Sequence, residues 1–411
     1  MKLVHYKEHL RSQRIHRACP ICQSSRRHLI FKQRFDGPQN SSLLAGYHVV
    51  SCAYCGFVYA DCIPEQAAFD GYYRRFSKYE YGHQGGEVSR SDIRTFERLA
   101  NFIYRARVHR RSAILDVGCA TGALLSVLGK RGFKDLHGMD PSLACAKTAA
   151  RLYGIPVITG SVFDLDLRHG QYDLIILTGV LEHIRDVQAA VQKVVARLTP
   201  QGHLLAGVPD ALGLAAAHNA PFQQFSVEHI NFFTPTSLTN LMAAAGLKRI
   251  VQMRMMREQG IGTTEPTVVG IYRRGFGPVK LRLDLQGRAA LQKYVAKSKE
   301  ADRHTRKIIR HATRGGRKIV IWGVGTLTQR LLAAGILKRE HIAAFVDSSP
   351  KMQGGTLVGQ RILAPAELRA RPEAIIIASW MFQKEIYAQI KKHLRLPNAV
   401  IKLYDVHCRR R

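Results

Sequence analysis

Long apolar runs are missing from this 411-residue sequence. No apolar stretch reaches about 18 residues, the length that marks a membrane-spanning helix. The first residues, Met1–Lys7, also lack the apolar segment of a secretory signal. We therefore expect a cytoplasmic protein without a transmembrane segment. Disorder is not expected for most of the chain, because 46% of its residues are hydrophobic, an ordinary fraction for globular proteins.

Acidic residues are scarce: 30 Asp and Glu stand against 62 Lys and Arg, so the formal net charge is +32. This excess favours acidic partners such as nucleic acid, an anionic membrane surface or a phosphate-bearing substrate. Basic clusters occur at Arg105–Arg111, in segment 288–318 and at Arg409–Arg411. Because a generally basic composition would give the same excess, the charge alone does not select a partner.

Four of the eight cysteines form two Cys-x-x-Cys pairs, Cys19/Cys22 and Cys52/Cys55. Each short loop places two thiolates on one side of a turn, and two such loops complete a tetrahedral zinc site. Four protein ligands leave no position open for water, so the predicted zinc is structural. Redox dithiols are the alternative interpretation, but paired thiols in a chain without a secretion signal favour metal binding.

The order of apolar runs and turns predicts an α/β protein in four segments. Residues 1–85 form a zinc-binding four-cysteine module that ends at the Gly-rich stretch 81–86, and residues 86–275 alternate strands with helices. Residues 276–316 form a helical linker, and residues 317–411 form a smaller Rossmann-like domain. In the second segment the expected strands are 113–117, 136–139, 156–159, 174–178, 203–208, 248–253 and 267–272.

A Gly-rich loop from Asp116 to Gly122 follows the first of these strands. Glycines there let the backbone turn sharply and approach a ligand, while the amides of the next helix face its polar groups. The spacing is G-x-x-x-G with an acid before it, which is not the G-x-G-x-x-G of dinucleotide sites. Asp140 ends the second strand, where a carboxylate accepts hydrogen bonds from ribose hydroxyls.

These two features, followed by Gln171–Ile176, Val180–Ile184 and Leu198–Gly202, resemble the motifs of class I S-adenosylmethionine-dependent methyltransferases. The resemblance implies that loop amides hold the methionine part, Asp140 holds ribose and Val162 with Phe163 flanks adenine. The cofactor-binding residues would then be Asp116, Gly118, Cys119, Ala120, Gly122, Asp140, Val162, Phe163 and Thr178. Asp164 either reaches the adenine amine or caps the turn.

A Glu-His pair, Glu228–His229, lies in the long segment after the fifth strand, which in this topology covers the ligand-binding ends of the strands. A histidine there can act as a base, and a glutamate can orient it. A histidine satisfied by backbone partners is the alternative. The pair Glu182–His183 allows a similar choice between catalysis and fixing the start of a helix.

The complete arrangement resembles the zinc-containing deoxysugar C-methyltransferases. The C-terminal segment contributes Asp347–Gly354, which is similar to the family's Asp-x-x-Pro-Lys-x-x-Gly stretch. The resemblance implies a methyltransferase that acts on carbon of a nucleotide-diphosphate ketosugar through an enolate, in polysaccharide or secondary-metabolite biosynthesis, with Glu228 and His229 as catalytic residues. The family has Tyr three residues before the catalytic His, whereas this chain has Ser226, so a glycan oxygen or nitrogen is an alternative acceptor.

Two other functions compete with this prediction. An RNA methyltransferase would combine a zinc module with basic charge, although the C-terminal Rossmann-like unit is unusual for RNA binding. A catalytically inactive binding protein is the other, and the intact cofactor loop argues against it.

The expected cofactors are S-adenosylmethionine and structural Zn²⁺. The expected partner is a nucleotide sugar; nucleic acid and peripheral contact with an anionic membrane are less favoured.

Overall fold

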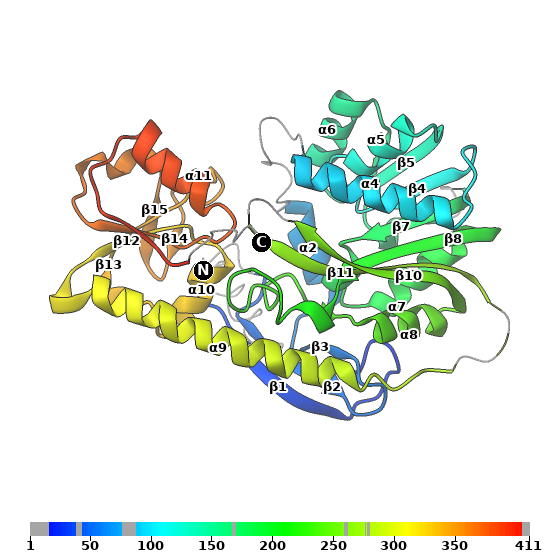
Figure 1. Cartoon of the computed structure of the whole chain (residues 1–411), viewed down its shortest axis with the longest axis horizontal. Helices are drawn as coiled ribbons and strands as arrows, with labels where there is room; N and C mark the ends of the chain where they lie inside the picture. The colour runs from blue at the N-terminus through cyan, green and yellow to red at the C-terminus, as the bar shows by residue number, and fades with distance from the viewer. Residues whose placement is uncertain are drawn as a thin grey trace, which may run out of the picture.

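The computed structural model describes residues 16–37, 43–75, 88–166, 170–258, 262–275, 277 and 280–404. The Gly-rich stretch 81–86 and the basic cluster Arg409–Arg411 lie outside these ranges. Figure 1 shows three parts that each contain a sheet, with one long helix running below the C-terminal sheet and above the N-terminal one. Among the described helices, none has both the length and the apolar character needed to cross a bilayer.

The central sheet has seven strands in the order β10-β11-β8-β7-β4-β5-β6. Strands β4 to β8 are parallel, whereas β11 and β10 form an antiparallel hairpin at one edge. The strands are β4 (Ala113–Val117), β5 (Asp135–Asp140), β6 (Val157–Thr159), β7 (Tyr172–Thr178), β8 (Leu198–Pro209), β10 (Leu247–Glu258) and β11 (Thr264–Arg274). This sheet confirms the predicted Rossmann-like centre.

Helices cover both faces of this sheet (Figure 1). One layer is α4 (Arg90–Arg105), α5 (Ala123–Lys130) and α6 (Leu143–Tyr153), and the other is α7 (Val187–Ala196) and α8 (Pro235–Ala244). Because neither face meets water, the parallel strands are short apolar runs. Leu174, Ile175, Ile176 and Leu177 are accordingly all fully buried.

The C-terminal sheet has six strands in the order β14-β15-β13-β12-β16-β17. All of its pairings are parallel except that of β14 with β15. Its elements are β12 (Ile319–Trp322), α10 (Thr326–Ala333), β13 (Ile342–Val346), β14 (Thr356–Leu357), β15 (Gln360–Leu363), β16 (Ala374–Ile377), α11 (Gln383–Ala388) and β17 (Val400–Lys402). The smaller Rossmann-like unit predicted from residue 317 onward is therefore present.

The N-terminal sheet contains a strand that the predicted linear division does not include. It is an antiparallel sheet of β1 (Arg27–Arg34), β2 (Gly46–Cys52), β3 (Val58–Asp61) and β9 (Asn231–Phe232), and helix α2 (Gln66–Arg75) follows β3. Strand β9 comes from the chain after β8, and Val58 pairs with Phe232. The segment that carries the predicted Glu-His pair therefore enters the N-terminal module before it returns to the central sheet.

The predicted linker is one helix, α9 (Gln286–Ala312), of 27 residues. In Figure 1 it runs from the C-terminal unit to the N-terminal sheet, and strands β1 and β2 lie below its right-hand part. Leu291, Tyr294 and Val295 belong to the hydrophobic core of the N-terminal module, whereas Ile309 belongs to that of the C-terminal unit. The helix therefore joins two cores and is not a solvated spacer.

Candidate functional site

The loop between β4 and α5 has the glycines that its conformation requires. Gly118 has a φ of +79°, and a Cβ atom there would lie 2.5 Å from Cγ2 of Val180. Its amide donates to the Met139 carbonyl at 2.7 Å, which holds the loop against the end of β5. Gly122 also has a φ of +79° and begins α5. A side chain at either position would strain the turn.

Asp140 braces this loop. One of its carboxylate oxygens accepts the Ala120 amide at 2.9 Å, and the other accepts the Ser142 amide at 2.9 Å. Each carboxylate oxygen has two lone pairs, so Asp140 can accept hydrogen bonds from a ligand as well. The residue lines a cavity at the carboxyl ends of the central strands.

Asp116 lies beneath the loop and is fully buried. Burial, and secondly the charge of Asp140, raise the pKa of Asp116 to about 7. Its Oδ1 atom has no hydrogen-bond partner among the described atoms. A buried carboxylate with a free acceptor is costly unless a donor or cation meets it. This observation fits a ligand that carries positive charge.

A cavity of about 490 Å³ opens at the carboxyl ends of the central strands. It is lined by Gln66, Asp70, Tyr73, Arg74, Val117, Gly118, Asp140, Pro141, Thr159, Gly160, Ser161, Val162, Phe163, Asp164, Gly179, Val180, His183, Ile184 and Glu228. Four predicted cofactor-binding residues, Gly118, Asp140, Val162 and Phe163, thus line the same cavity. Cys119, Ala120 and Gly122 belong to the adjoining loop but are not among the lining residues.

Thr178 and Asp164 differ from the other residues near the cavity in their surroundings. Thr178 lines a neighbouring pocket of about 40 Å³, which it shares with Glu182, rather than the large cavity. Asp164 accepts the amide of Ser161 at 2.7 Å and its hydroxyl at 3.0 Å. Of the two interpretations of Asp164, the structure therefore shows the turn cap.

Helix α2 of the N-terminal module also lines the cavity, through Gln66, Asp70, Tyr73 and Arg74. No sequence pattern indicated this contribution. The hydroxyl of Tyr72 donates to Oε1 of Glu228 at 3.1 Å. The hydroxyl of Tyr73 lies 3.0 Å from Nδ1 of His183. No motif marks α2, because its contribution depends on how two distant segments pack.

His229 is not among the residues that line the cavity, but it packs against one that does. Its ring lies 4.7 Å from that of His183, which faces the cavity. Its Nδ1 atom lies 2.8 Å from Oε1 of Gln224, whose Nε2 donates to Oε1 of Glu265 at 2.8 Å. Because an amide oxygen only accepts, Nδ1 of His229 carries a proton.

Ser226 has a defined role in the turn before His229. Its hydroxyl accepts the backbone amides of Glu228 at 3.2 Å and His229 at 3.1 Å. The Tyr47 hydroxyl donates to the Ser226 carbonyl at 2.9 Å. Ser226 thus shapes the backbone, and the tyrosine hydroxyls of the site come from α2.

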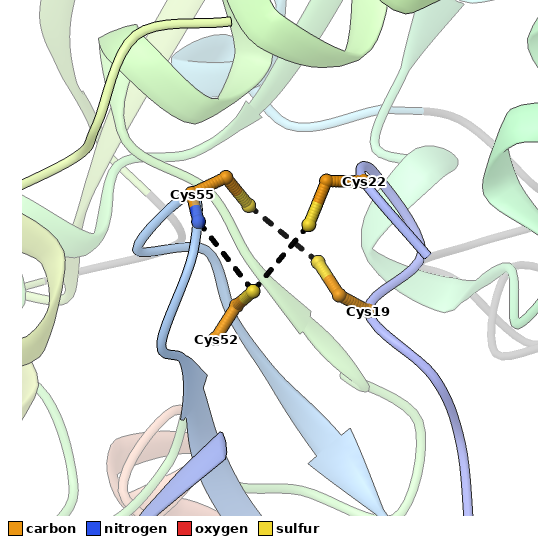
Figure 2. A group of neighbouring side chains, drawn as sticks. All are labelled: Cys19, Cys22, Cys52 and Cys55. Carbon is orange, nitrogen blue, oxygen red and sulfur yellow. Dashed lines mark hydrogen bonds between the residues drawn. The ribbon is translucent and has the colours of Figure 1, made fainter. Parts of the chain in front are cut away.

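The four predicted zinc ligands converge. Figure 2 shows Cys19 and Cys22 on one loop facing Cys52 and Cys55 on another. The sulfur atoms of Cys19 and Cys55 lie 3.5 Å apart, as do those of Cys22 and Cys52. Such separations suit ligands around one tetrahedral ion.

Without a cation, the four cysteines would not all be ionised as thiolates. Hydrogen bonding with Cys19 and Cys55 lowers the pKa of Cys52. Hydrogen bonding with Cys52 raises the pKa of Cys19 to about 12, and hydrogen bonding with Cys19 raises that of Cys55. One thiolate is therefore favoured over four, and a divalent cation would be needed to ionise the others.

A second polar group, His16, Asp61 and Cys62, also brings possible metal ligands together. Here the Arg27 guanidinium already lies 2.8 Å from both the Asp61 carboxylate and Nδ1 of His16. Because Arg27 supplies the cation, we assign this group as an ion-pair network.

Two family models match successive parts of the chain. A family model described as a methyltransferase domain matches residues 91–252, and one described as a C-methyltransferase C-terminal domain matches residues 280–401. The C-methyltransferase NovU of Streptomyces niveus is 25% identical over 295 residues, 68% of this chain and 69% of that protein. A ubiquinone biosynthesis O-methyltransferase of Nitrobacter winogradskyi is 32% identical over 115 residues, 25% of this chain and 43% of that protein.

Solved structures show weaker similarity. Magnesium protoporphyrin IX methyltransferase of Synechocystis PCC 6803 with bound SAH is 16% identical, with a TM-score of 0.38 over 51% of this chain and 97% of that one. A 1,6-didemethyltoxoflavin-N1-methyltransferase of Burkholderia thailandensis is 19% identical, with a TM-score of 0.40 over 55% and 97%.

The raised pKa of Asp116 predicts how stability changes with pH. Between about pH 4 and about pH 7 the folded chain binds the Asp116 proton and the unfolded chain does not. Stability should therefore fall as pH rises through this window, by up to roughly 1.4 kcal/mol per pH unit. Urea unfolding of the ligand-free protein at several pH values measures this, and Asp116→Asn should flatten the slope. An equal slope in both proteins would contradict the prediction.

Proposed function

We propose that this protein methylates a carbon of a nucleotide-linked deoxysugar. The chain is an S-adenosylmethionine-dependent methyltransferase, because a methyltransferase domain precedes a C-methyltransferase C-terminal domain. The observation that carries this proposal is the 490 Å³ cavity, in which cofactor-loop residues face Glu228 and His183. The same cavity is thus lined by residues of the methyl-donor site and by residues capable of acid–base chemistry. The pathway we propose for it is polysaccharide or secondary-metabolite biosynthesis.

The donor would lie against Gly118, Asp140, Val162 and Phe163. Asp140 would accept hydrogen bonds from ribose hydroxyls, and Val162 with Phe163 would flank adenine. The carboxylate of Asp116 would stabilise the positive charge of the donor from below the loop. Amides of residues 118–122, including those of Cys119 and Ala120, would hold the methionine part, and Thr178 would contact the donor from the end of β7. When bound, S-adenosylmethionine supplies a methyl group activated by its sulfonium.

Proton removal falls to His229, with Glu228 orienting the acceptor. Nδ1–H of His229 donates to Gln224, which fixes the orientation of the ring, and the ring packs against His183, which lines the cavity. A proton leaves the carbon beside the sugar carbonyl, and the electrons of that C–H bond form an enolate. The enolate carbon would then take the methyl group that S-adenosylmethionine supplies when bound, with a C–C bond formed and the methyl–sulfur bond broken.

The nucleotide would be received by the C-terminal unit, which repeats the geometry of the donor loop. Oxygens of Asp347 accept the amides of Val324 at 2.9 Å and Ser349 at 2.8 Å, as those of Asp140 accept Ala120 and Ser142. The Gly323 amide donates to the Val346 carbonyl at 2.8 Å, as Gly118 does to Met139. This repetition supports a second nucleoside-binding crevice.

Transfer of radiolabelled methyl from S-adenosylmethionine tests the acceptor class. Nucleotide ketosugars, glycans, ribosomal RNA and transfer RNA are supplied in parallel, and the methylated atom is assigned from the product. We expect label on carbon of a nucleotide sugar. Label in RNA alone would overturn the proposal, and label on oxygen or nitrogen of a glycan would retain the cofactor site but replace the enolate step.

Variants of the histidine pair test the base. His229→Ala should lower kcat by about 100-fold or more, the usual contribution of a positioned base, while the affinity for S-adenosylmethionine stays near that of the wild type. Gln224→Leu should lower kcat less and shift its pH profile, because the His229 tautomer is no longer fixed. Turnover of His229→Ala at the wild-type rate would show that the base lies elsewhere.

We also propose that Cys19, Cys22, Cys52 and Cys55 hold one structural Zn²⁺. Cys19, Cys52 and Cys55 are buried in the core cluster that includes central-sheet residues such as Val117 and Leu177. The ion would therefore stabilise the junction of the two modules rather than take part in methyl transfer.

Elemental analysis of the purified protein should find one zinc per chain, and Cys22→Ser should remove it. The melting temperature of that variant should fall by roughly 5–10 °C, since each kcal/mol shifts it by about 2–4 °C. Cys145→Ser, which alters a buried cysteine of α6 outside the cluster, is the matched control and should retain the metal. Purified wild-type protein without metal would refute the zinc site.

A further inference from the structure

Three large apolar side chains are exposed where the Cys52–Cys55 loop meets the start of α9. Tyr54 is 70% exposed, Leu283 is 54% exposed and Leu285 is 77% exposed. Single exposed apolar residues are common and need no explanation. These three stand out because two separate segments present them at one place. We call them the apolar tip.

Hydrogen bonds hold the two segments of the apolar tip together. The amide of Asp284, between the two leucines, donates to the Cys55 carbonyl at 3.0 Å. The approach is close, because a Cβ atom on Gly56 would lie 2.2 Å from the Asp284 carbonyl oxygen. Residues 283–285 therefore pack directly on the loop that carries Tyr54.

The leucines are presented outward by a fixed backbone. The buried Asp284 carboxylate accepts the Thr234 hydroxyl at 2.5 Å and the amides of Gln286 and Gly287. Asn240 contacts the Arg282 backbone on both sides, accepting its amide at 2.9 Å and donating to its carbonyl at 2.6 Å. With residues 282 and 284 fastened inward, Leu283 and Leu285 cannot turn into the core without breaking these bonds.

Basic side chains surround the apolar tip. Residues 280–299 contain six Lys or Arg and a single acid, the buried Asp284. Arg282 and Arg288 are exposed beside the leucines. Exposed Arg26 accepts the amide of Ala53 with its carbonyl at 2.9 Å, which places it beside Tyr54. The next acid along α9 is Glu300.

Exposed apolar side chains beside basic ones fit an anionic membrane surface better than they fit nucleic acid. An anionic bilayer attracts Lys and Arg to its headgroups, accepts a Tyr ring at the interface and takes Leu into its acyl region. RNA would use the basic side chains but would leave the leucines in water. We propose that the apolar tip, together with Arg26, Arg282 and Arg288, docks this protein on an anionic lipid surface. The proposal is independent of the acceptor and of the catalytic residues.

Flotation with vesicles tests the apolar tip. A chain of net charge +32 adsorbs to anionic vesicles by charge alone, so the decisive comparison keeps the charge constant. Wild-type protein and the triple variant Tyr54→Ser/Leu283→Ser/Leu285→Ser are floated with vesicles of phosphatidylcholine and phosphatidylglycerol at raised salt. We expect partitioning of the variant to fall by about tenfold or more, because the apolar area that it buries is lost.

The matched control is Ile250→Ser/Phe382→Ser, which removes two exposed apolar side chains elsewhere and should float like the wild type. Arg282→Glu/Arg288→Glu should weaken binding at low salt, and pure phosphatidylcholine vesicles should bind poorly. All variants should methylate a soluble acceptor at the wild-type rate, which separates this proposal from that of the reaction.

Tyr54→Trp supplies a direct measure of insertion. Brominated acyl chains should quench its added fluorescence, beyond any change in the wild-type signal from Trp322 and Trp380. Equal flotation of the triple variant and the wild type, or absence of this quenching, would overturn the proposal. Tight binding of RNA that the triple variant retains, without insertion, would show that the basic surface serves nucleic acid instead.

Discussion

The pairing of β9 with β3 is the contact on which the geometry of the site depends. The chain leaves the central sheet after β8, pairs Asn231 and Phe232 with the cysteine module and then returns to α8. Glu228 and His229 directly precede β9, so their distance from the cofactor loop is set by a strand in another sheet. Buried Arg17 reinforces this pairing, because its guanidinium donates to Oδ1 of Asn231 at 3.0 Å. The N-terminal module is thus part of the site.

The parts of the fold that the sequence predicts have local causes. Strand β4 coincides with its predicted range, because strands buried on both faces are short apolar runs between turns. The cofactor loop was predictable because Gly118 must adopt a positive φ. Strand β9 was not, since two residues carry no periodicity and their partner lies far away in the chain. Helix α2 was missed for the same reason: Tyr72 and Tyr73 become site residues only through packing.

Side-chain direction limits what the Glu-His pair could predict. The dipeptide indicates acid–base chemistry, but adjacent residues point in different directions, and the structure separates them accordingly. Glu228 faces the cavity and Tyr72, whereas His229 turns toward Gln224. For His183 the sequence left open a choice between catalysis and fixing the start of a helix. In the structure its imidazole lines the cavity. Gln224 could not be assigned at all, because an uncharged amide in a loop carries no signal of its role until its neighbours are known.

The two Rossmann-like units hold their glycine loops with the same aspartate contacts, but only the central unit has a second buried carboxylate, that of Asp116. Asp140 and Asp347 each accept an amide of the glycine loop and an amide two residues beyond themselves. The loops are therefore ordered before any ligand arrives, which lowers the entropic cost of binding. When Gly118 is matched to Gly323, the position of Asp116 corresponds to that of Ile321, which is fully buried. The second carboxylate, which favours a cationic ligand, is thus confined to the central unit. This difference supports assigning the sulfonium donor to the central sheet and an uncharged or anionic nucleotide ligand to the C-terminal crevice.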